Sequence, residues 1–112
     1  MTDEALTGDR LLAALSALAS PHRLRIVAAL AGRRNYVSQL ARDLGMNRPL
    51  LHMHLRRLEA AGLIVGTLEL STDGKAMKYF EAAPFALTVT PASVRAAVAT
   101  LTTDTAQPDE VD

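Results

Sequence analysis

The chain has 112 residues, which suffice for one domain with a modest core and leave no room for a separate catalytic domain. It contains no cysteine, so disulfides, thiolate metal sites and cysteine nucleophiles are excluded. The formal net charge is zero, but residues 10–101 hold all 12 basic residues and five of the 12 acidic ones, and so carry +7. Such a basic body is typical of a phosphate-binding protein, although a mixed surface with acidic, solubilising ends gives the same balance.

The two ends of the chain differ from its body in charge. Residues 1–8 and 104–112 contain acidic residues and no basic ones, and we expect both segments to be flexible. Residues 9–103 are then expected to form the folded domain. The acidic start lacks the basic residues of a secretory signal, and the longest apolar run is too short to cross a bilayer. We therefore expect a cytoplasmic protein without a membrane partner.

Two helices are predicted in the first third of the chain. The first covers residues 9–19 and carries a wide apolar stripe. The residues of this stripe are Leu11, Leu12, Leu15 and Leu18. Ser20 caps the second helix, Pro21 begins it and Gly32 ends it, while Arg23 is predicted to project away from the core. The residues predicted to face inward on this helix are Leu24, Val27, Ala28 and Ala31.

Residues 35–64 predict two short helices joined by a glycine turn. The apolar residues that recur at helical spacing in the first helix are Val37, Leu40, Ala41 and Leu44. Gly45 ends this helix in the left-handed conformation, and Asn47 caps the next one, which begins at Arg48. The inner stripe of the second helix is Leu51, Leu55 and Leu58, and its outer face is Arg48, His52, Arg56 and Glu59. A solvated surface helix gives a similar outer face, but the whole combination is typical of a unit that enters the DNA major groove.

After Gly62 the apolar period changes from that of a helix to that of a strand. LIVGTLEL and AMKYFEAA flank Asp73-Gly74, which is a strong hairpin signal. Gly66 indicates a bulge or a close backbone approach. Such a hairpin is a wing whose Lys75 and Lys78 reach DNA phosphates or the minor groove. The alternative is an ordinary edge hairpin whose lysines discourage aggregation.

A last helix begins at Thr90 and Pro91, which again combine a capping residue with a proline. Its apolar side is predicted to be Val94, Ala97, Val98 and Leu101. Together the elements predict a mainly α domain with a small β-hairpin. The predicted order, α-α-α-α-β-β-α, is that of a winged helix-turn-helix.

The chain from Ser20 to Leu101 resembles the winged helix-turn-helix regulators of the arsenic-repressor (ArsR) type. The matching segments are SPHRLRIVAAL, VSQLARDLGMNRPLLHMHLRRLEAAGLI, and a wing with an Asp-Gly turn and KYF in its returning strand. The resemblance implies a sequence-specific transcriptional regulator that binds double-stranded DNA at an inverted-repeat operator. Such a regulator represses or activates nearby genes, and we expect a repressor, although the sequence does not decide the direction of control. It also implies a homodimer built mainly from the first and last helices. The leucines of the first helix give pairing a physical reason, because an isolated helix would expose them to water.

The sequence departs from this family in its sensing sites. Many members bind metals through cysteines in the first helix of the reading unit, and this chain has none. Another family site uses carboxylate and histidine ligands on the last helix, whereas PASVRAAVATL contains neither. We therefore expect no metal and no cofactor, and the sequence does not indicate a small-molecule effector.

The candidate DNA contacts follow from the outer face of the second reading helix. Arg48, His52 and Arg56 are the first candidates for the groove, because arginine can bond both acceptors of guanine. Pro49 and Met53 are candidates for thymine methyl contacts, with packing as the alternative for Met53. The other candidate DNA-binding residues, expected mainly at phosphates, are Ser38, Gln39, Asn47, Arg57, Lys75 and Lys78, with Arg33 and Arg34 as further flanking contacts.

The histidines of this helix have different predicted roles. His54 lies beside the inner leucines and is predicted to be a hydrogen-bonded structural histidine. At 100° per residue, His52 and His54 point roughly 200° apart and cannot chelate one metal ion.

Two other classes of function are open on the sequence. A winged-helix adaptor that binds proteins instead of DNA has the same fold, since sites and not folds carry function. An outer helix face that is acidic or leucine-rich would favour the adaptor, and the arginines favour DNA. An enzyme is not expected, because no phosphate-cradling glycine loop, paired carboxylates or nucleophile–base arrangement is recognisable.

Overall fold

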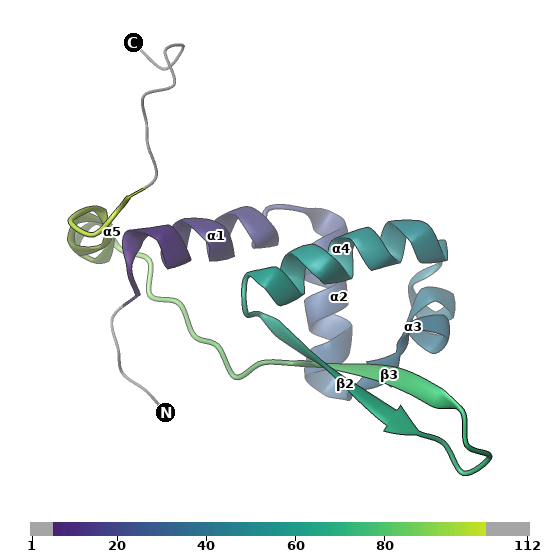
Figure 1. Ribbon diagram of the computed structural model, residues 1–112. Coiled ribbons are helices and arrows are strands. Elements are labelled where there is room, and N and C mark those ends of the chain that lie inside the picture. The colour runs from purple at the N-terminus through teal and green to yellow at the C-terminus, as the bar shows by residue number, and fades with distance from the viewer. Residues whose placement is uncertain (1–5, 103–112) are drawn as a thin grey trace. The chain divides into compact units, whose positions relative to one another are not determined.

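The computed structural model describes residues 6–102 (Figure 1), and most of the two acidic ends lies outside them. The described elements are α1 (Gly8–Leu18), α2 (Pro21–Gly32), β1 (Asn35–Tyr36), α3 (Val37–Leu44), α4 (Arg48–Ala60), β2 (Ile64–Leu70), β3 (Ala76–Ala82) and α5 (Pro91–Val98). Residues 14–85 form one compact unit, and a second unit joins the described residues before 14 to those after 85. None of the described helices has the length and apolar character needed to span a bilayer.

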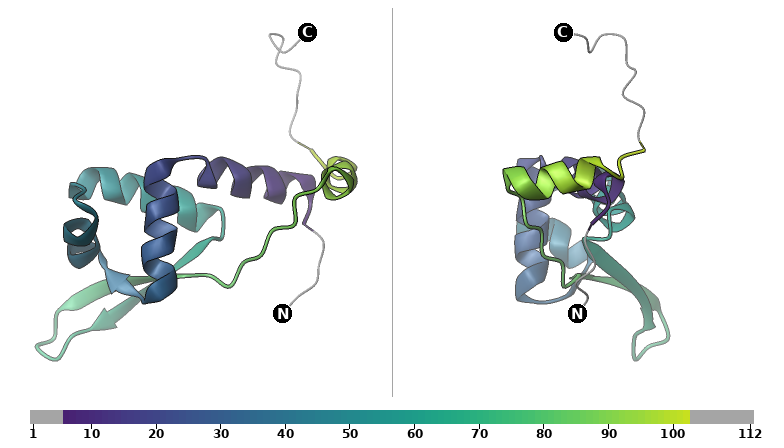
Figure 2. Two further views of the ribbon diagram at one scale, coloured as in Figure 1. Left: turned by 180° about the vertical axis from the view of Figure 1, so that it is seen from behind. Right: turned by 90° about the vertical axis from the view of Figure 1, so that its left-hand side faces the viewer.

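The core of the larger unit lies among α2, α3, α4 and the sheet. The large side chains that are almost fully removed from water are Ile26, Leu40, Leu51, Leu55, Leu58 and Ile64. The three leucines predicted for the inner stripe of α4 are all in this set, which confirms the orientation of that helix. Figures 1 and 2 show the β2–β3 hairpin projecting away from the three helices, as a wing does.

The inner face of α2 differs from the prediction. Ser20 caps the helix by accepting a hydrogen bond from the Arg23 N–H, as expected, but Leu24 is 54 % exposed. The buried residues of α2 are Arg23, Ile26 and Leu30. The predicted face was wrong because apolar residues occur on nearly all sides of this helix, so periodicity does not select one. A charged side chain such as Arg23 is usually exposed to solvent, but here buried hydrogen-bond acceptors on Ala17 and His54 keep it inside the fold.

A short strand, β1, was not predicted. Asn35 and Tyr36 pair antiparallel with Phe80 and Tyr79, which gives a three-stranded sheet in the order β1-β3-β2. The predicted order of elements therefore lacks one strand. Two residues are too few to show an alternating pattern, so only the tertiary pairing reveals this strand.

The wing is a regular hairpin with continuous pairing from Ile64 opposite Ala82 to Leu70 opposite Ala76. Gly74 has a φ of 86°, which explains the glycine in the tip. The continuous register excludes a bulge at Gly66. A Cβ at this position would lie 2.9 Å from Cε1 of the buried Phe80 ring, so the close approach of this side chain accounts for the glycine.

The smaller unit contains α5 and the start of α1. Thr90 and Ser93 cap α5 reciprocally, and the Gly8 N–H donates to Oγ1 of Thr100 at 2.8 Å. Of the four residues predicted for the apolar side of α5, Ala97 is buried, while Val98 is 57 % exposed. The leucine stripe predicted for α1 is likewise only partly buried. The apolar residues that α1 and α5 leave exposed are Leu12, Leu15, Val94 and Val98.

Candidate nucleic-acid interface

The segment between α3 and α4 is a tight turn of the kind predicted. Gly45 has a φ of 63°, and the N–H of Met46 donates to the carbonyl of Ala41 at 3.0 Å. Oδ1 of Asn47 then accepts a hydrogen bond from the Leu50 N–H at 2.9 Å and caps α4. The Asn47 side chain therefore already has a structural role, and its amide N–H₂ is the part left for another partner. These contacts define a helix-turn-helix.

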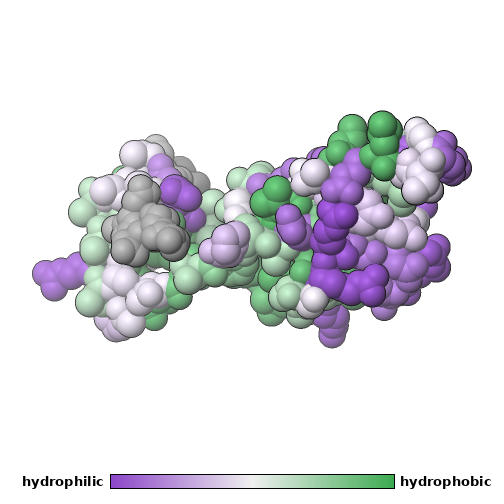
Figure 3. Space-filling view, turned by 90° about the horizontal axis from the view of Figure 1, so that it is seen from below, coloured by the Kyte–Doolittle hydropathy of each residue, from purple (hydrophilic) through white to green (hydrophobic). Residues whose placement is uncertain are grey.

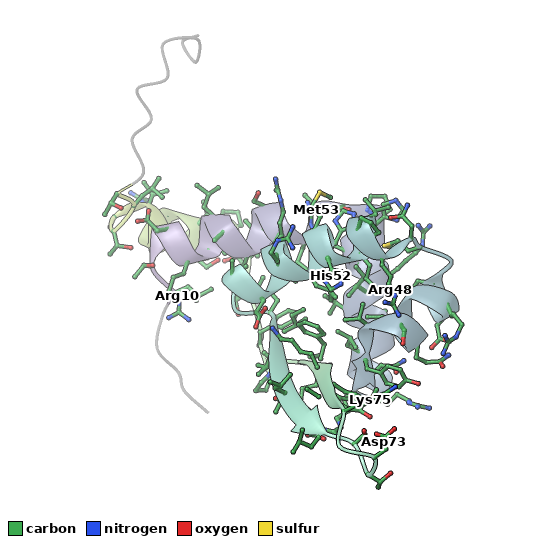
Figure 4. The ribbon with its side chains drawn as sticks, turned by 45° about the vertical axis from the view of Figure 1, so that its right-hand side comes forward. Arg10, Arg48, His52, Met53, Asp73 and Lys75 are labelled. Atoms are coloured by element: carbon green, nitrogen blue, oxygen red, sulfur yellow. The ribbon has the colours of Figure 1, made fainter. Side chains whose placement is uncertain are left out.

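One ridge of α4 carries three exposed cationic or ionisable side chains. Arg48, His52 and Arg56 are spaced four residues apart, so they lie along the same side of the helix. Among the described residues, none pairs with or hydrogen-bonds to these three side chains. Figure 4 places Arg48 and His52 on the side of α4 nearer to the wing. The predicted groove-facing ridge is therefore open to a partner.

The other candidates on α4 are also exposed. Met53 is 40 % exposed and lies along the opposite, upper edge of α4 in Figure 4, so it does not share the ridge of Arg48 and His52. This exposure places Met53 outside the core and leaves packing at the edge of α4 as the alternative to a DNA contact. Pro49 and Arg57 are exposed as well. Their DNA contacts stay predictions.

The candidates on α3 lie at its beginning. The Gln39 side chain donates to Asp43 at 2.7 Å and accepts from Arg42 at 2.7 Å, so it belongs to a polar network on the helix surface. Ser38 is half-buried in the first turn. Since Tyr36 provides no side-chain cap, the first N–H groups of α3 are left for other acceptors.

The two wing lysines have different surroundings. Lys75 is exposed at the tip, near Gly74 (Figure 4). Hydrogen bonds from the Ser71 hydroxyl and the Lys75 N–H lower the pKa of the tip carboxylate, Asp73. Lys78 lies further from the tip, with Nζ 4.0 Å from a carboxylate oxygen of Glu59, so the end of α4 offsets part of its charge.

The wing also has features that the sequence analysis missed. Leu68 and Leu70 are 68 % and 75 % exposed. Figure 3 shows hydrophobic side chains beside a mainly hydrophilic surface over the wing end of this unit. The alternation of residues along β2 places both leucines on one face of the strand. It does not show that this part of the strand lies beyond the helices that form the core.

Arg34, a candidate phosphate contact, pairs with the wing, and its DNA contact stays a prediction. Its guanidinium donates to both carboxylate oxygens of Glu69, at 2.5 and 2.9 Å, and lies 4.4 Å from the ring centroid of Tyr79. The hydrogen bonds from Arg34 lower the pKa of Glu69. The pairing joins the chain before β1 to β2, and it leaves Arg33 and Lys75 as the less restrained cations of this region.

A buried polar contact lies beneath α4. His54 is 5 % exposed, and its Nδ1 is 3.0 Å from a terminal nitrogen of Arg23. The prediction of a hydrogen-bonded structural histidine is confirmed. His52 and His54 lie on opposite sides of the helix, one exposed and one buried. Within residues 6–102, no three His, Asp or Glu side chains are grouped so that they could hold a metal ion.

These features define the class of protein: a winged helix-turn-helix with an open, basic reading helix. The sequence pattern of the bacterial regulatory proteins of the arsR family matches residues 20–65. An HTH-type transcriptional regulator of Methanocaldococcus jannaschii is 33% identical over 69 residues, which cover 62% of this chain and 72% of that protein. CmtR, an HTH-type transcriptional regulator of Mycobacterium tuberculosis, is 41% identical over 63 residues, 56% of this chain and half of CmtR. The chain belongs to the ArsR family.

Solved structures agree on the fold. The homodimeric winged helix-turn-helix DNA-binding domain of a possible ArsR-family regulator from Mycobacterium bovis superposes with a TM-score of 0.59 at 24% identity, covering 81% of this chain and 74% of that one. An ArsR-like transcriptional regulator from Rhodococcus gives 0.58 at 22% identity, covering 82% and 76%. The fold and the family make this protein a transcriptional regulator with a DNA-binding winged helix-turn-helix, and not an enzyme.

Proposed function

We propose that this protein is a homodimeric repressor that binds an inverted-repeat operator by placing α4 in the major groove and the wing against the flanking backbone. The observation that carries the proposal is the open ridge of Arg48, His52 and Arg56, which follows a capped helix start and a glycine turn. Arginine on such a ridge can read guanine, and the exposed Lys75 and Arg57 can meet phosphates. Repression then follows from occupancy, because a dimer on its operator blocks other proteins from that stretch of DNA.

The proposal predicts a steep dependence of DNA binding on salt. Each neutralised phosphate releases about 0.9 counterion, so a dimer with six or more phosphate contacts loses about a thousandfold or more in affinity between 50 and 200 mM salt. Fluorescence anisotropy with the DNA that flanks the gene, beside a scrambled duplex of equal length, measures this. Affinity that does not change with salt, or equal affinity for both duplexes, would contradict the proposal and favour the adaptor alternative.

A second copy of this chain is the proposed partner of α1 and α5. These helices leave Leu12 48 % exposed and Val98 57 % exposed. Contact with a second subunit would remove these apolar side chains from water, which is favourable. The Mycobacterium bovis neighbour is a homodimer. Two-fold pairing places two reading helices on one face of a duplex, which matches the symmetry of an inverted repeat.

Replacing Leu12 by Glu is expected to convert the dimer to a monomer, because the carboxylate would have to lose its hydration in the interface. Sedimentation equilibrium measures the mass directly. Leu24→Glu is the matched control, since Leu24 is 54 % exposed on α2, which we do not assign to the interface. A dimer that survives Leu12→Glu, or that dissociates equally in the control, would show that the interface lies elsewhere.

A further inference from the structure

The guanidinium of Arg23 joins three helices from inside the larger unit. Arg23 is 8 % exposed, and its Nε donates to the carbonyl of Ala17 in the last turn of α1 at 2.6 Å. One of its terminal nitrogens lies 3.0 Å from Nδ1 of His54 on α4. A guanidinium has donors and no acceptor, so Nδ1 must accept. The neutral ring of His54 therefore carries its proton on Nε2.

This contact tolerates one protonation state of His54. In the imidazolium both ring nitrogens carry a proton, so Nδ1–H would face the N–H of Arg23. The hydrogen bond would be lost, and two positive charges would stand about 3 Å apart in a buried site, where charges without a partner are costly. Nε2 of His54 is buried and has no hydrogen-bond partner among the described residues. Nε2 therefore offers no hydrogen bond that could replace the lost bond between Nδ1 and Arg23.

The groups around His54 all favour the neutral ring. They are Arg23 and His22 on α2 and Arg57 on α4, and the ring of His22 lies 5.3 Å from that of His54 between centroids. Burial first, and then these cationic or ionisable neighbours, lower the pKa of His54. The unfolded chain consequently takes up this proton before the folded chain does. The stability that the neutral ring contributes is complete above about pH 6.5 and decreases as the pH falls below it.

We propose that Arg23 and neutral His54 position α4 against α2, and that protonation of His54 releases α4 and weakens DNA binding in mild acid. The inference rests on the proposed role of α4 as the DNA-reading helix. Arg23 on α2 and His54 on the buried side of α4 are positioning residues, because both side chains are enclosed by the fold and act through the placement of α4. His52 is exposed on the same helix and lies outside this contact, so it provides the matched control.

The test compares DNA affinity at pH 7.5 and pH 5 at constant ionic strength, in wild type, His54→Asn and His52→Asn. Oδ1 of asparagine keeps an acceptor close to the place of Nδ1 but cannot be protonated. We expect the wild type to lose affinity in acid by about tenfold, within the range usual for coupling between two sites. The His54→Asn variant is expected to lose little or none, and the His52→Asn control to lose at least as much as the wild type. Equal acid losses in wild type and His54→Asn would overturn the inference, as would a wild type that loses none.

Two further measurements separate positioning from loss of fold or of DNA contact. Far-UV circular dichroism at each pH shows whether the chain is folded where affinity falls. Arg23→Met is expected to lower affinity without changing the salt slope, because a buried guanidinium releases no counterion from DNA, whereas Arg57→Ala removes an exposed charge and makes the slope shallower. A shallower slope in Arg23→Met would mean that Arg23 contacts phosphate, and it would overturn the positioning role.

The ring of His54 can also be observed without DNA. Nitrogen chemical shifts of the wild-type protein at pH 7.5 are expected to show the Nε2–H tautomer. Intrinsic amide exchange is slower at pH 5 than at pH 7.5, and after correction for this the protection factors of the α4 amides are expected to be lower at pH 5. An Nδ1–H tautomer would overturn the inference. If the tautomer and the exchange behave as expected but no duplex binds at any pH, the proposed function fails and the positioning of α4 stands.

Discussion

Replacing both Arg48 and Arg56 by alanine is expected to reduce operator affinity by at least about a hundredfold. Each bidentate contact between an arginine and a guanine contributes about 1–3 kcal/mol of discrimination, and a two-fold symmetric dimer loses each contact twice. Since neither side chain has a partner among the described residues, truncation removes no internal contact. Stability should therefore stay near that of the wild type while anisotropy titrations report the loss.

Comparing the loss of affinity on operator and on scrambled DNA distinguishes base contacts from contacts with the phosphate backbone. Arg25→Ala is the matched control, because Arg25 is exposed on α2 and has no proposed DNA contact. Lys75→Ala is expected to weaken binding to all duplexes by a similar factor, as a phosphate contact does. Arg48→Ala should instead reduce the ratio of the affinity for the operator to the affinity for scrambled DNA. If the double variant binds the operator as tightly as the Arg25 control does, α4 does not read DNA, and the adaptor function becomes the better account.

Leu51→Ala is expected to lower the free energy of unfolding by about 2–5 kcal/mol, through lost transfer energy and the cavity left behind. Leu51 is fully buried on the side of α4 that packs into the core. A domain of this size has about 5–15 kcal/mol in total, so the variant stands close to unfolding. Denaturant unfolding at one fixed protein concentration measures the change, because the stability of a dimer depends on concentration.

The wing provides a control with the same chemical change. Leu70 is 75 % exposed, so Leu70→Ala is expected to alter stability by no more than about 0.5 kcal/mol. A loss of similar size in both variants would mean that the wing leucine is covered in solution, by the second subunit or by another part of the chain. A small loss in Leu51→Ala alone would contradict the packing of α4 described above.

The proposed effect of pH on α4 comes from the buried Arg23–His54 contact. His52 and His54 are two positions apart in sequence, and the helical turn assigns His52 to solvent and His54 to the core. The partners of each histidine therefore follow from its placement on the helix.

The sequence by itself determined the parts of the fold that depend on local chemistry. Gly45 predicted the left-handed turn, Asn47 the cap of α4, and Asp73-Gly74 the tip of the wing, because each needs only its own backbone conformation or a neighbour within three residues. The inner leucines of α4 were predicted for the same reason, since their spacing fits one helical face and charged residues occupy the other. The open ridge of the candidate site follows directly from that pattern.

The tertiary structure decided what depends on partners distant in sequence. Strand β1 exists only because Phe80 and Tyr79 pair with Asn35 and Tyr36. The burial of Arg23, and with it the inner face of α2, requires acceptors from Ala17 and from a helix 31 residues further along the chain. Charge on a residue predicts exposure unless the fold supplies such acceptors, and no local pattern encodes them.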